Sequence, residues 1–192
     1  VQDIYNEMTL SFRGNYDLVF RMYNDGLAYR FTTKMKNDIV VVDEEADYTF
    51  SSDHMAFAPY VNSKKATFEE QFMNSFEQPY VHEPITKLNS KRLMILPLLV
   101  ELDGGKKLCI TEADLEDYPG MFLNNSTDKP VLKPIFASYP KVKKQGGHNN
   151  LQMLVEERED YIAKTSGTRA FPWRVFIVSE NDKQLADCDM VY

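Results

Sequence analysis

The chain has 192 residues, of which 43% are hydrophobic and 12% aromatic, so it can build one folded domain with a sizeable core. Its formal net charge of −7 argues against nucleic-acid binding, because a phosphate-binding surface needs a basic stripe. No apolar run approaches the ~20 residues that a membrane-spanning helix requires.

Strand patterns dominate the first fifty residues. Polar and apolar side chains alternate in short segments, which are separated by the turn sequences Gly14-Asn15 and Asn24-Asp25-Gly26. The pattern predicts a β-hairpin followed by further strands. The expected strands cover residues 8–12, 16–24, 27–33 and two segments within 38–50 that join at the acidic residues 43–45.

The middle of the chain is less regular. Three phenylalanines recur every four residues within 63–77, which suits either a short helix or a loop whose aromatic side chains cover the core. The continuous apolar run 93–102 predicts a strand buried on both faces, with Pro97 at an edge or a bulge. A turn at residues 103–105 then leads into another strand within 106–115.

The last third returns to alternation. The basic cluster 141–144 lies beside two glycines and predicts a solvated loop, whereas 151–157 and 161–165 predict strands. Residues 169–180 predict one long strand with even- and odd-numbered side chains on opposite faces. About ten strands, with turns roughly every 8–12 residues, predict an all-β fold, an antiparallel β-sandwich without any helix of three or more turns.

Most catalytic and metal-binding patterns do not occur in the sequence. The three histidines are far apart, and no His or Cys pair has the spacing of a zinc site. No G-x-S-x-G nucleophile motif occurs, and the glycines sit in turns rather than in a phosphate-binding loop. Cys109 and Cys188 lie in apolar runs, where we expect two buried thiols rather than a disulfide.

Carboxylates are the remaining candidates for chemistry. Glu112, Asp114, Glu116 and Asp117 fall within the stretch "ITEADLEDYPGMFL" (110–123), directly after an apolar strand. Calcium prefers several oxygen ligands, but these residues lack the spacing of a calcium-binding helix–loop–helix. From the local pattern alone, a polar turn is therefore favoured over a metal ligand.

Sugar recognition is the other chemistry that the residue types allow. Trp173 lies beside Arg169 and Arg174, and aromatic faces with planar polar groups are what saccharide sites use. A single tryptophan in an alternating strand is nevertheless more often part of a core, so the pattern favours packing.

Three stretches together resemble the amino-terminal domain of glycoside hydrolase family 97, which comprises bacterial α-glucosidases and α-galactosidases of the Bacteroidetes type. They are "YNDGLAYRF" (23–31), "ITEADLEDYPGMFL" (110–123) and "GTRAFPWRVFIVSENDKQLADCDMVY" (167–192), and "FEQPYVHEPI" (76–85) and "LPLLVEL" (96–102) also fit. Each motif alone is weak, but their order and spacing along nearly the whole chain make the resemblance specific.

The resemblance implies a single domain over 1–192, a β-sandwich of the galactose-mutarotase-like kind that packs on a catalytic (β/α)₈ barrel. It further implies that this chain lacks the barrel and the first strands of the sandwich, whose absence could leave a sheet edge bare. In that family the sandwich lends a glutamate to a calcium ion in the active site, and the motif places it at Glu112. Asp117, Tyr118, Arg169 and Trp173 are then candidates for the pocket wall or domain interface.

Three functions follow as hypotheses. The first is a non-catalytic domain that supports the barrel of a calcium-dependent exo-α-glycosidase acting on α-linked glycans, located in the periplasm or secreted. The second is a free-standing carbohydrate-binding module. The third, a mutarotase-like epimerase, rests on fold analogy alone. In the first hypothesis the isolated chain is inactive and binds calcium weakly or not at all, because a lone carboxylate is a poor calcium site.

Overall fold

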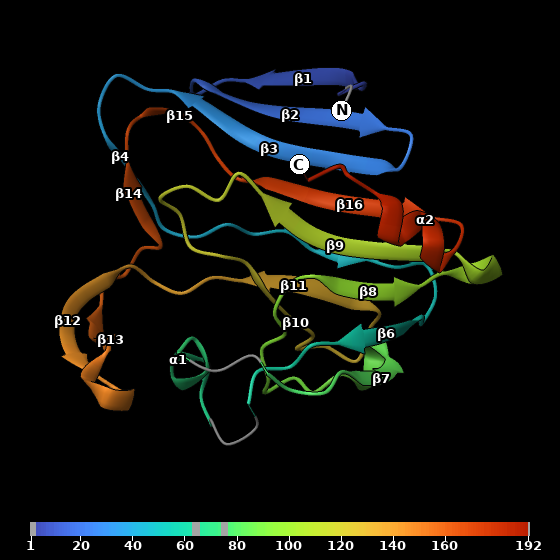
Figure 1. The fold of residues 1–192 in the computed structure, drawn as a ribbon. Helices are drawn as coiled ribbons and strands as arrows, with labels where there is room; N and C mark the ends of the chain where they lie inside the picture. The colour runs from blue at the N-terminus through green and yellow to red at the C-terminus, as the bar shows by residue number, and fades with distance from the viewer. Residues whose placement is uncertain (1–2, 63–65, 74–76, 192) are drawn as a thin grey trace.

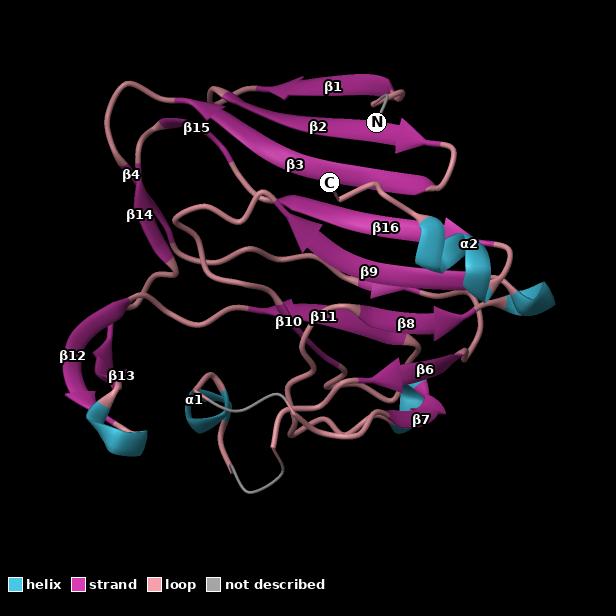
Figure 2. Cartoon of the chain, viewed as in Figure 1, coloured by secondary structure: helices cyan, strands magenta, loops and turns pink. Residues whose placement is uncertain are grey.

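The computed structural model describes residues 3–62, 66–73 and 77–191, and builds them mainly from antiparallel strands (Figures 1 and 2). Eight strands of the large sheet are ordered β1-β2-β3-β16-β9-β8-β6-β7, and β15 pairs with β3. In that order the strands are β1 (Asn6–Phe12), β2 (Tyr16–Tyr23), β3 (Gly26–Lys34), β16 (Trp173–Ser179), β9 (Lys107–Ala113), β8 (Leu98–Glu101), β6 (Met55–Ala58) and β7 (Val81–Pro84), with β15 (Thr168–Ala170) beside β3.

Three smaller sets of strands complete the fold. A three-stranded sheet has the order β10-β11-β5, and two strand pairs, β12–β13 and β14–β4, stand apart from it. Their bounds are β10 (Phe122–Asn124), β11 (Val131–Ile135), β5 (Tyr48–Thr49), β12 (Pro140–Gly146), β13 (Gln152–Arg158), β14 (Ala163–Thr165) and β4 (Ile39–Val41). The helices are short: α1 (Phe68–Gln71), α2 (Asp182–Asp187), and the 3-10 turns η1 (Ile85–Lys87), η2 (Asp103–Gly105) and η3 (His148–Asn150).

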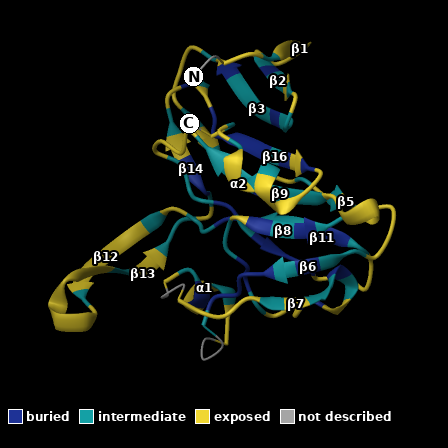
Figure 3. Cartoon of the chain, turned by 45° about the vertical axis from the view of Figure 1, so that its right-hand side comes forward, coloured by how far each residue is buried: buried dark blue, intermediate teal, exposed yellow. Residues whose placement is uncertain are grey.

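The main core lies between the large sheet and the three-stranded sheet. Side chains from β6, β8 and β9 pack against side chains from β10 and β11, and Leu98, Ile110, Leu123 and Leu132 are fully buried. Figure 3 shows the buried strands β6, β8 and β11 in this layer. Two sheets that bury their facing sides against each other form a sandwich, so the predicted all-β fold is confirmed.

A second, smaller core covers the outer face of the large sheet. Trp173, Val175 and Ile177 of β16 pack there with Ala28 of β3, and α2 and the residues after it lie against them. Strand β16 is therefore buried on both faces. Among the described residues no helix is long and apolar enough to cross a membrane.

Turn chemistry explains the strand order near the amino terminus. Gly14 and Asn15 adopt positive φ and join β1 to β2, as the sequence predicts. The next turn leads into β3 at Gly26, where an added Cβ would lie 2.1 Å from the carbonyl oxygen of Phe176 on β16. Only glycine allows the two strands to approach this closely.

Strand β1 forms one edge of the large sheet, and all seven of its residues are exposed (Figure 3). Met8, Leu10 and Phe12 are 41–53% exposed on one side of it. Among the described residues, no strand pairs with the outer edge of β1.

Several local predictions need correction. The apolar run 93–102 forms a strand only from Leu98, directly after Pro97, because proline cannot donate a ladder hydrogen bond. The basic cluster 141–144 is not a loop but part of β12, which pairs with β13 in a hairpin that projects from the body (Figures 1 and 3). The long strand expected at 169–180 is two strands, since Phe171 and Pro172 interrupt it.

Two open alternatives are resolved. Within 63–77 a one-turn helix, α1, begins after Thr67, whose hydroxyl accepts a hydrogen bond from the backbone N–H of Glu70. Phe76 and its neighbours at 74–75, like 63–65, lie outside the described residues. Cys109 and Cys188 are free thiols, as expected, although they are half-buried rather than fully buried.

Candidate functional site

The acidic stretch forms the connection from β9 to β10. Asp114 and Asp117 adopt positive φ of 57° and 47°, a conformation that aspartate tolerates better than most residues. Arg169 holds this loop through its backbone, because its guanidinium donates to the carbonyl oxygen of Glu116 at 2.9 Å and that of Asp117 at 3.4 Å. The same guanidinium donates to the hydroxyl of Thr165 at 2.6 Å, so the loop is tied to β14.

A buried ion triad lies directly beneath the loop. Arg174 donates through Nε and one terminal nitrogen to the two carboxylate oxygens of Glu44, both at 2.7 Å, and through its other terminal nitrogen to Oε2 of Glu112 at 2.7 Å. The hydroxyl of Tyr118 donates to Glu44 at 3.3 Å. The backbone N–H of Met121 donates to both oxygens of Glu112, at 3.1 and 3.2 Å.

Strand register explains how these groups meet. Arg174 on β16 and Glu112 on β9 are direct partners across an antiparallel ladder, so their side chains lie on the same, inner face of the sheet. Glu44 reaches them from the connection between β4 and β5. The arginine side chain is 1% exposed, and the two carboxylates are 10% and 14% exposed.

Burial and charge act in opposite directions here. Burial raises the pKa of Glu112 above its usual range, while the charge of Arg174 and the N–H of Met121 partly offset that rise. The pKa of Arg174 is also raised, since its bonds to Glu44 and its attraction to both carboxylates outweigh its own burial. With one cation and two carboxylates, the ionised triad carries one net negative charge in a nearly dry site.

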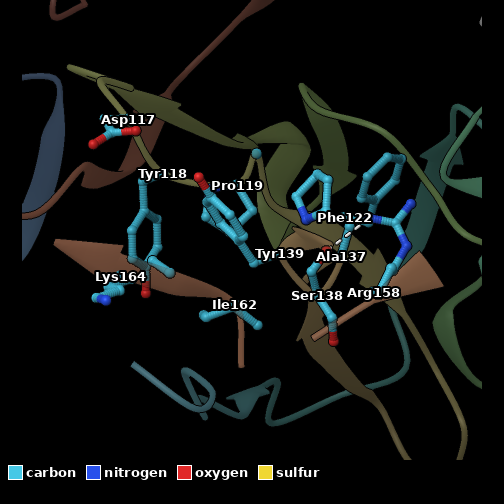
Figure 4. A pocket seen from close by; sticks show the side chains of 13 residues that line it. Asp117, Tyr118, Pro119, Phe122, Ala137, Ser138, Tyr139, Arg158, Ile162 and Lys164 are labelled. Carbon is cyan, nitrogen blue, oxygen red and sulfur yellow. Dashed lines mark hydrogen bonds between the residues drawn. The ribbon is translucent and has the colours of Figure 1, made fainter. Parts of the chain in front are cut away.

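A cavity of about 420 Å³ opens on the other side of the loop (Figure 4). Residues 117–120 form one wall, and Tyr139, Arg158 and Lys164 contribute to the rest. An added Cβ at Gly120, a residue of this wall, would lie 3.3 Å from Oε1 of Glu112, so this carboxylate lies close behind the wall.

The structure brings most of the predicted site residues together. Asp117 and Tyr118 line the cavity, Glu112 lies behind its wall, and Arg169 fixes the loop. Trp173 lies on the opposite face of the sheet, where its ring stacks against the guanidinium groups of Arg21 and Arg30 at 4.8 and 4.2 Å. The roles of these residues in a pocket or a domain interface stay predictions.

Glu44 was missed in the sequence, and Arg174 was considered only as a sugar-binding group. The signal for Arg174 was present: a charged side chain inside an apolar strand needs a buried partner. Nothing local identified Glu44 as that partner, because 130 residues separate it from Arg174.

The oxygen ligands around Glu112 do not by themselves make up a calcium site. No group of three or more His, Cys, Asp or Glu side chains that could hold a metal ion occurs among residues 3–62, 66–73 and 77–191. Glu112 can supply one carboxylate through Oε1, while Oε2 is bound to Arg174. The net negative charge of the triad suits a cation, but further ligands have to come from elsewhere.

Comparisons with known proteins agree with this fold. Residues 1–192 match the sequence model of the Glycosyl-hydrolase 97 N-terminal family. The chain is 50% identical over 189 residues to a retaining alpha-galactosidase of Bacteroides thetaiotaomicron, covering 98% of this chain and 28% of that protein. It therefore spans less than a third of the length of this relative.

Solved structures show the same fold at lower sequence identity. A glycoside hydrolase family 97 enzyme from Pseudoalteromonas sp. strain K8, in complex with acarbose, matches with a TM-score of 0.71 and 21% identity, covering 99% of this chain and 26% of that one. A beta-arabinopyranosidase matches with a TM-score of 0.66 and 17% identity, covering 92% and 28%. Since the family match spans every residue, the chain belongs to the glycosyl hydrolase 97 N-terminal family.

Proposed function

We propose that this chain is the non-catalytic amino-terminal domain of a calcium-dependent exo-α-glycosidase, and that the enzyme is an α-galactosidase. The observation that carries the proposal is the 50% identity, over nearly the whole chain, to a retaining alpha-galactosidase. An identity this high over nearly the whole chain makes a related role for the domain the simplest expectation. By analogy with the family, the enzyme acts in the periplasm or is secreted.

Catalysis is assigned to a barrel outside this chain. Glycoside hydrolysis needs two carboxyl groups that flank the scissile bond. The two carboxylates buried beneath the loop, Glu44 and Glu112, cannot flank a sugar, because the guanidinium of Arg174 occupies the space between them. The triad of Glu44, Arg174 and Glu112 instead suits a domain that supports the barrel and completes its pocket.

Glu112 would supply one ligand to a calcium ion shared with the barrel. It lies near the end of β9, which is paired with a neighbouring strand on each side, and a shared ligand needs such a rigid mounting. Its position behind the wall formed by residues 117–120 places it at the margin of the domain's cavity. When bound, calcium stabilises negative charge that develops on oxygen atoms in the active site.

The cavity wall would face the glycan or the barrel. Tyr118 and Tyr139 offer aromatic surface, and Asp117 and Lys164 offer polar groups for hydroxyls. Tyr139 stacks on Tyr161 at 5.7 Å between ring centroids, which holds its ring in place. A preformed wall of this kind would limit which sugars fit beside the barrel.

The test compares two polypeptides: the isolated chain 1–192 and the full-length protein that carries it. Hydrolysis of an aryl α-galactoside is measured with calcium and with a chelator. We expect activity from the full-length protein only, with calcium dependence that Glu112→Gln weakens. Calcium-stimulated hydrolysis by the isolated chain would show that the domain is itself catalytic.

The other two hypotheses receive no support from the site. A free-standing carbohydrate-binding module would use Trp173 as a platform, but that ring is 9% exposed and lies against two arginines. An epimerase would need a histidine acid beside a carboxylate base in a pocket. His82 does bond to Glu101 at 2.9 Å, but neither residue lines the cavity.

A further inference from the structure

The guanidinium of Arg174 links two carboxylates that come from different parts of the chain. Its Nε and one terminal nitrogen form a two-pronged contact with Glu44, which fixes the plane of the guanidinium. The remaining terminal nitrogen then has one direction in which to donate, toward Oε2 of Glu112. Glu44 therefore determines the orientation of Arg174, and Arg174 determines that of Glu112.

The carboxylate of Glu112 is oriented as well as paired. Its Oε2 accepts from Arg174 at 2.7 Å, and the backbone N–H of Met121 bridges both oxygens. Among the described residues, no side-chain donor bonds to Oε1. One oxygen is thus held by the triad while the other points toward the loop.

Gly120 is the residue next to that second oxygen. An alanine Cβ at position 120 would lie 3.3 Å from Oε1 of Glu112, which is tighter than most contacts of real Cβ atoms. Gly120 is not among the glycines with positive φ, so the backbone does not demand glycine here. Glycine at this position therefore leaves space beside the carboxylate that a larger side chain would occupy.

Stability alone is a weak reason for such a triad. Replacing a buried ion triad with apolar residues of similar volume is often neutral or stabilising, because burying charge is costly. A triad that holds one carboxylate in a single orientation, with Oε1 bonded to a backbone N–H and a glycine beside it, is what a ligand mounting requires.

From these contacts we infer that Arg174 and Glu44 are positioning residues for Glu112, and that Gly120 keeps Oε1 of Glu112 open to a cation. This inference rests on the proposed role of Glu112 as a calcium ligand. It assigns to this domain a mounting of four residues, Glu44, Arg174, Glu112 and Gly120, instead of one carboxylate.

The test uses charge-conserving variants of the full-length protein. Arg174→Lys keeps the positive charge but cannot form the two-pronged contact with Glu44. Glu44→Asp keeps the negative charge, but its side chain is one methylene too short to reach the guanidinium of Arg174 in the same geometry. Calcium affinity is measured by titration calorimetry, and the melting temperature is measured on the metal-free protein. Arg21→Lys is the matched control, because Arg21 pairs with Glu7 on the outer face of the same sheet.

We expect each of the two variants to weaken calcium binding by about 10-fold or more in protein that is still folded, as outer-shell partners of metal ligands typically do. The control should stay within about twofold of the wild type. A merely structural role for the triad would lower the melting temperature of the metal-free protein and leave the affinity of the folded protein unchanged.

Gly120→Ala provides an independent arm if the triad variants do not fold. It should weaken calcium binding while changing the melting temperature of the metal-free protein little, since its backbone φ suits alanine. If Glu112→Gln abolishes binding while Arg174→Lys, Glu44→Asp and Gly120→Ala all bind normally, the positioning inference is wrong and the proposed function stands. If Glu112→Gln itself binds calcium normally, the proposed role of Glu112 is wrong, and the inference fails with it.

Discussion

Arg174→Met would remove the positive charge that two buried carboxylates share. Glu44 and Glu112 are 10% and 14% exposed, so water cannot replace the three hydrogen bonds that the guanidinium donates. Breaking a buried ion pair by removing one partner typically costs about 3–5 kcal/mol. For a chain of this length, that loss corresponds to a fall in melting temperature of roughly 6–20 °C.

The pH dependence of this loss has a definite sign. Burial raises the pKa of Glu112 and Arg174 lowers it, so removing the arginine raises that pKa further. A folded-state pKa above the unfolded one means that the folded protein takes up its proton first as the pH falls. The loss of stability caused by Arg174→Met is therefore full above the folded-state pKa of Glu112 and shrinks as the pH drops through that pKa.

Thermal and urea unfolding of the isolated chain, followed by circular dichroism at neutral and mildly acidic pH, would measure both effects. Adding Glu44→Gln and Glu112→Gln to Arg174→Met removes the stranded charges and should restore more than half of the lost stability. Lys144→Met is the control, because Lys144 pairs with Glu156 on the surface and an exposed pair contributes only about 0–1 kcal/mol.

Two results would refute this reasoning. A loss below about 1 kcal/mol for Arg174→Met would show that the carboxylates are solvated in the variant. Failure of the neutral triple variant to recover would mean that packing of the arginine stem, rather than charge, supplies the stability.

Three further predictions concern other parts of the fold. Trp173→Ala should destabilise the chain by about 3–5 kcal/mol, because the ring is buried in the outer core. Calorimetry with maltooligosaccharides should show no accompanying loss of sugar affinity. A folded variant that loses such affinity would favour the carbohydrate-binding module. Gly26→Ala should lower the free energy of unfolding in urea by more than about 2 kcal/mol, since the added Cβ would meet strand β16. Gly104→Ala has free space and should lower it by only ~1 kcal/mol, the cost of placing alanine in the left-handed region. Equal losses in the two variants would contradict this difference. Asp53→Asn should make the free energy of unfolding fall less steeply at acidic pH. Hydrogen bonds from the hydroxyl and the backbone N–H of Thr86 hold the pKa of Asp53 below its usual value, so the wild type loses this stabilisation as the pH falls through the folded pKa. The same acid dependence in the variant would show that these bonds do not persist in solution.

Local chemistry made the amino-terminal strands and the turns between them predictable. Gly14-Asn15 and Asn24-Asp25-Gly26 mark turns whose backbone geometry few other residues adopt, so the first three strands follow from short-range sequence. Where local signals were ambiguous, prediction failed. The hairpin β12–β13 carries lysines on one strand and glutamates on the other, and its charge pattern resembles a solvated loop until the pairing is seen.

The candidate site was half predictable. Glu112 was found through its motif, and Asp117 and Tyr118 through their place in the same stretch. The wall that they form with Tyr139 and Lys164 could not be found, because these segments approach one another only in the folded chain. Alternation along 169–180 predicted that Trp173 and Arg174 lie on opposite faces of the strand, but only the strand register shows that Arg174 is the one that faces Glu112.

The sequence by itself determined the all-β class and the family, and it singled out Glu112 as a candidate metal ligand. These depend on alternation, turn residues and ordered motifs, all of which are readable within short windows. Only the tertiary structure decided what surrounds that residue. Glu44 and Glu112 lie 68 positions apart and Arg174 another 62 positions on, yet one guanidinium binds both carboxylates. Contacts of that range come from sheet register and sandwich packing, which local sequence patterns do not specify.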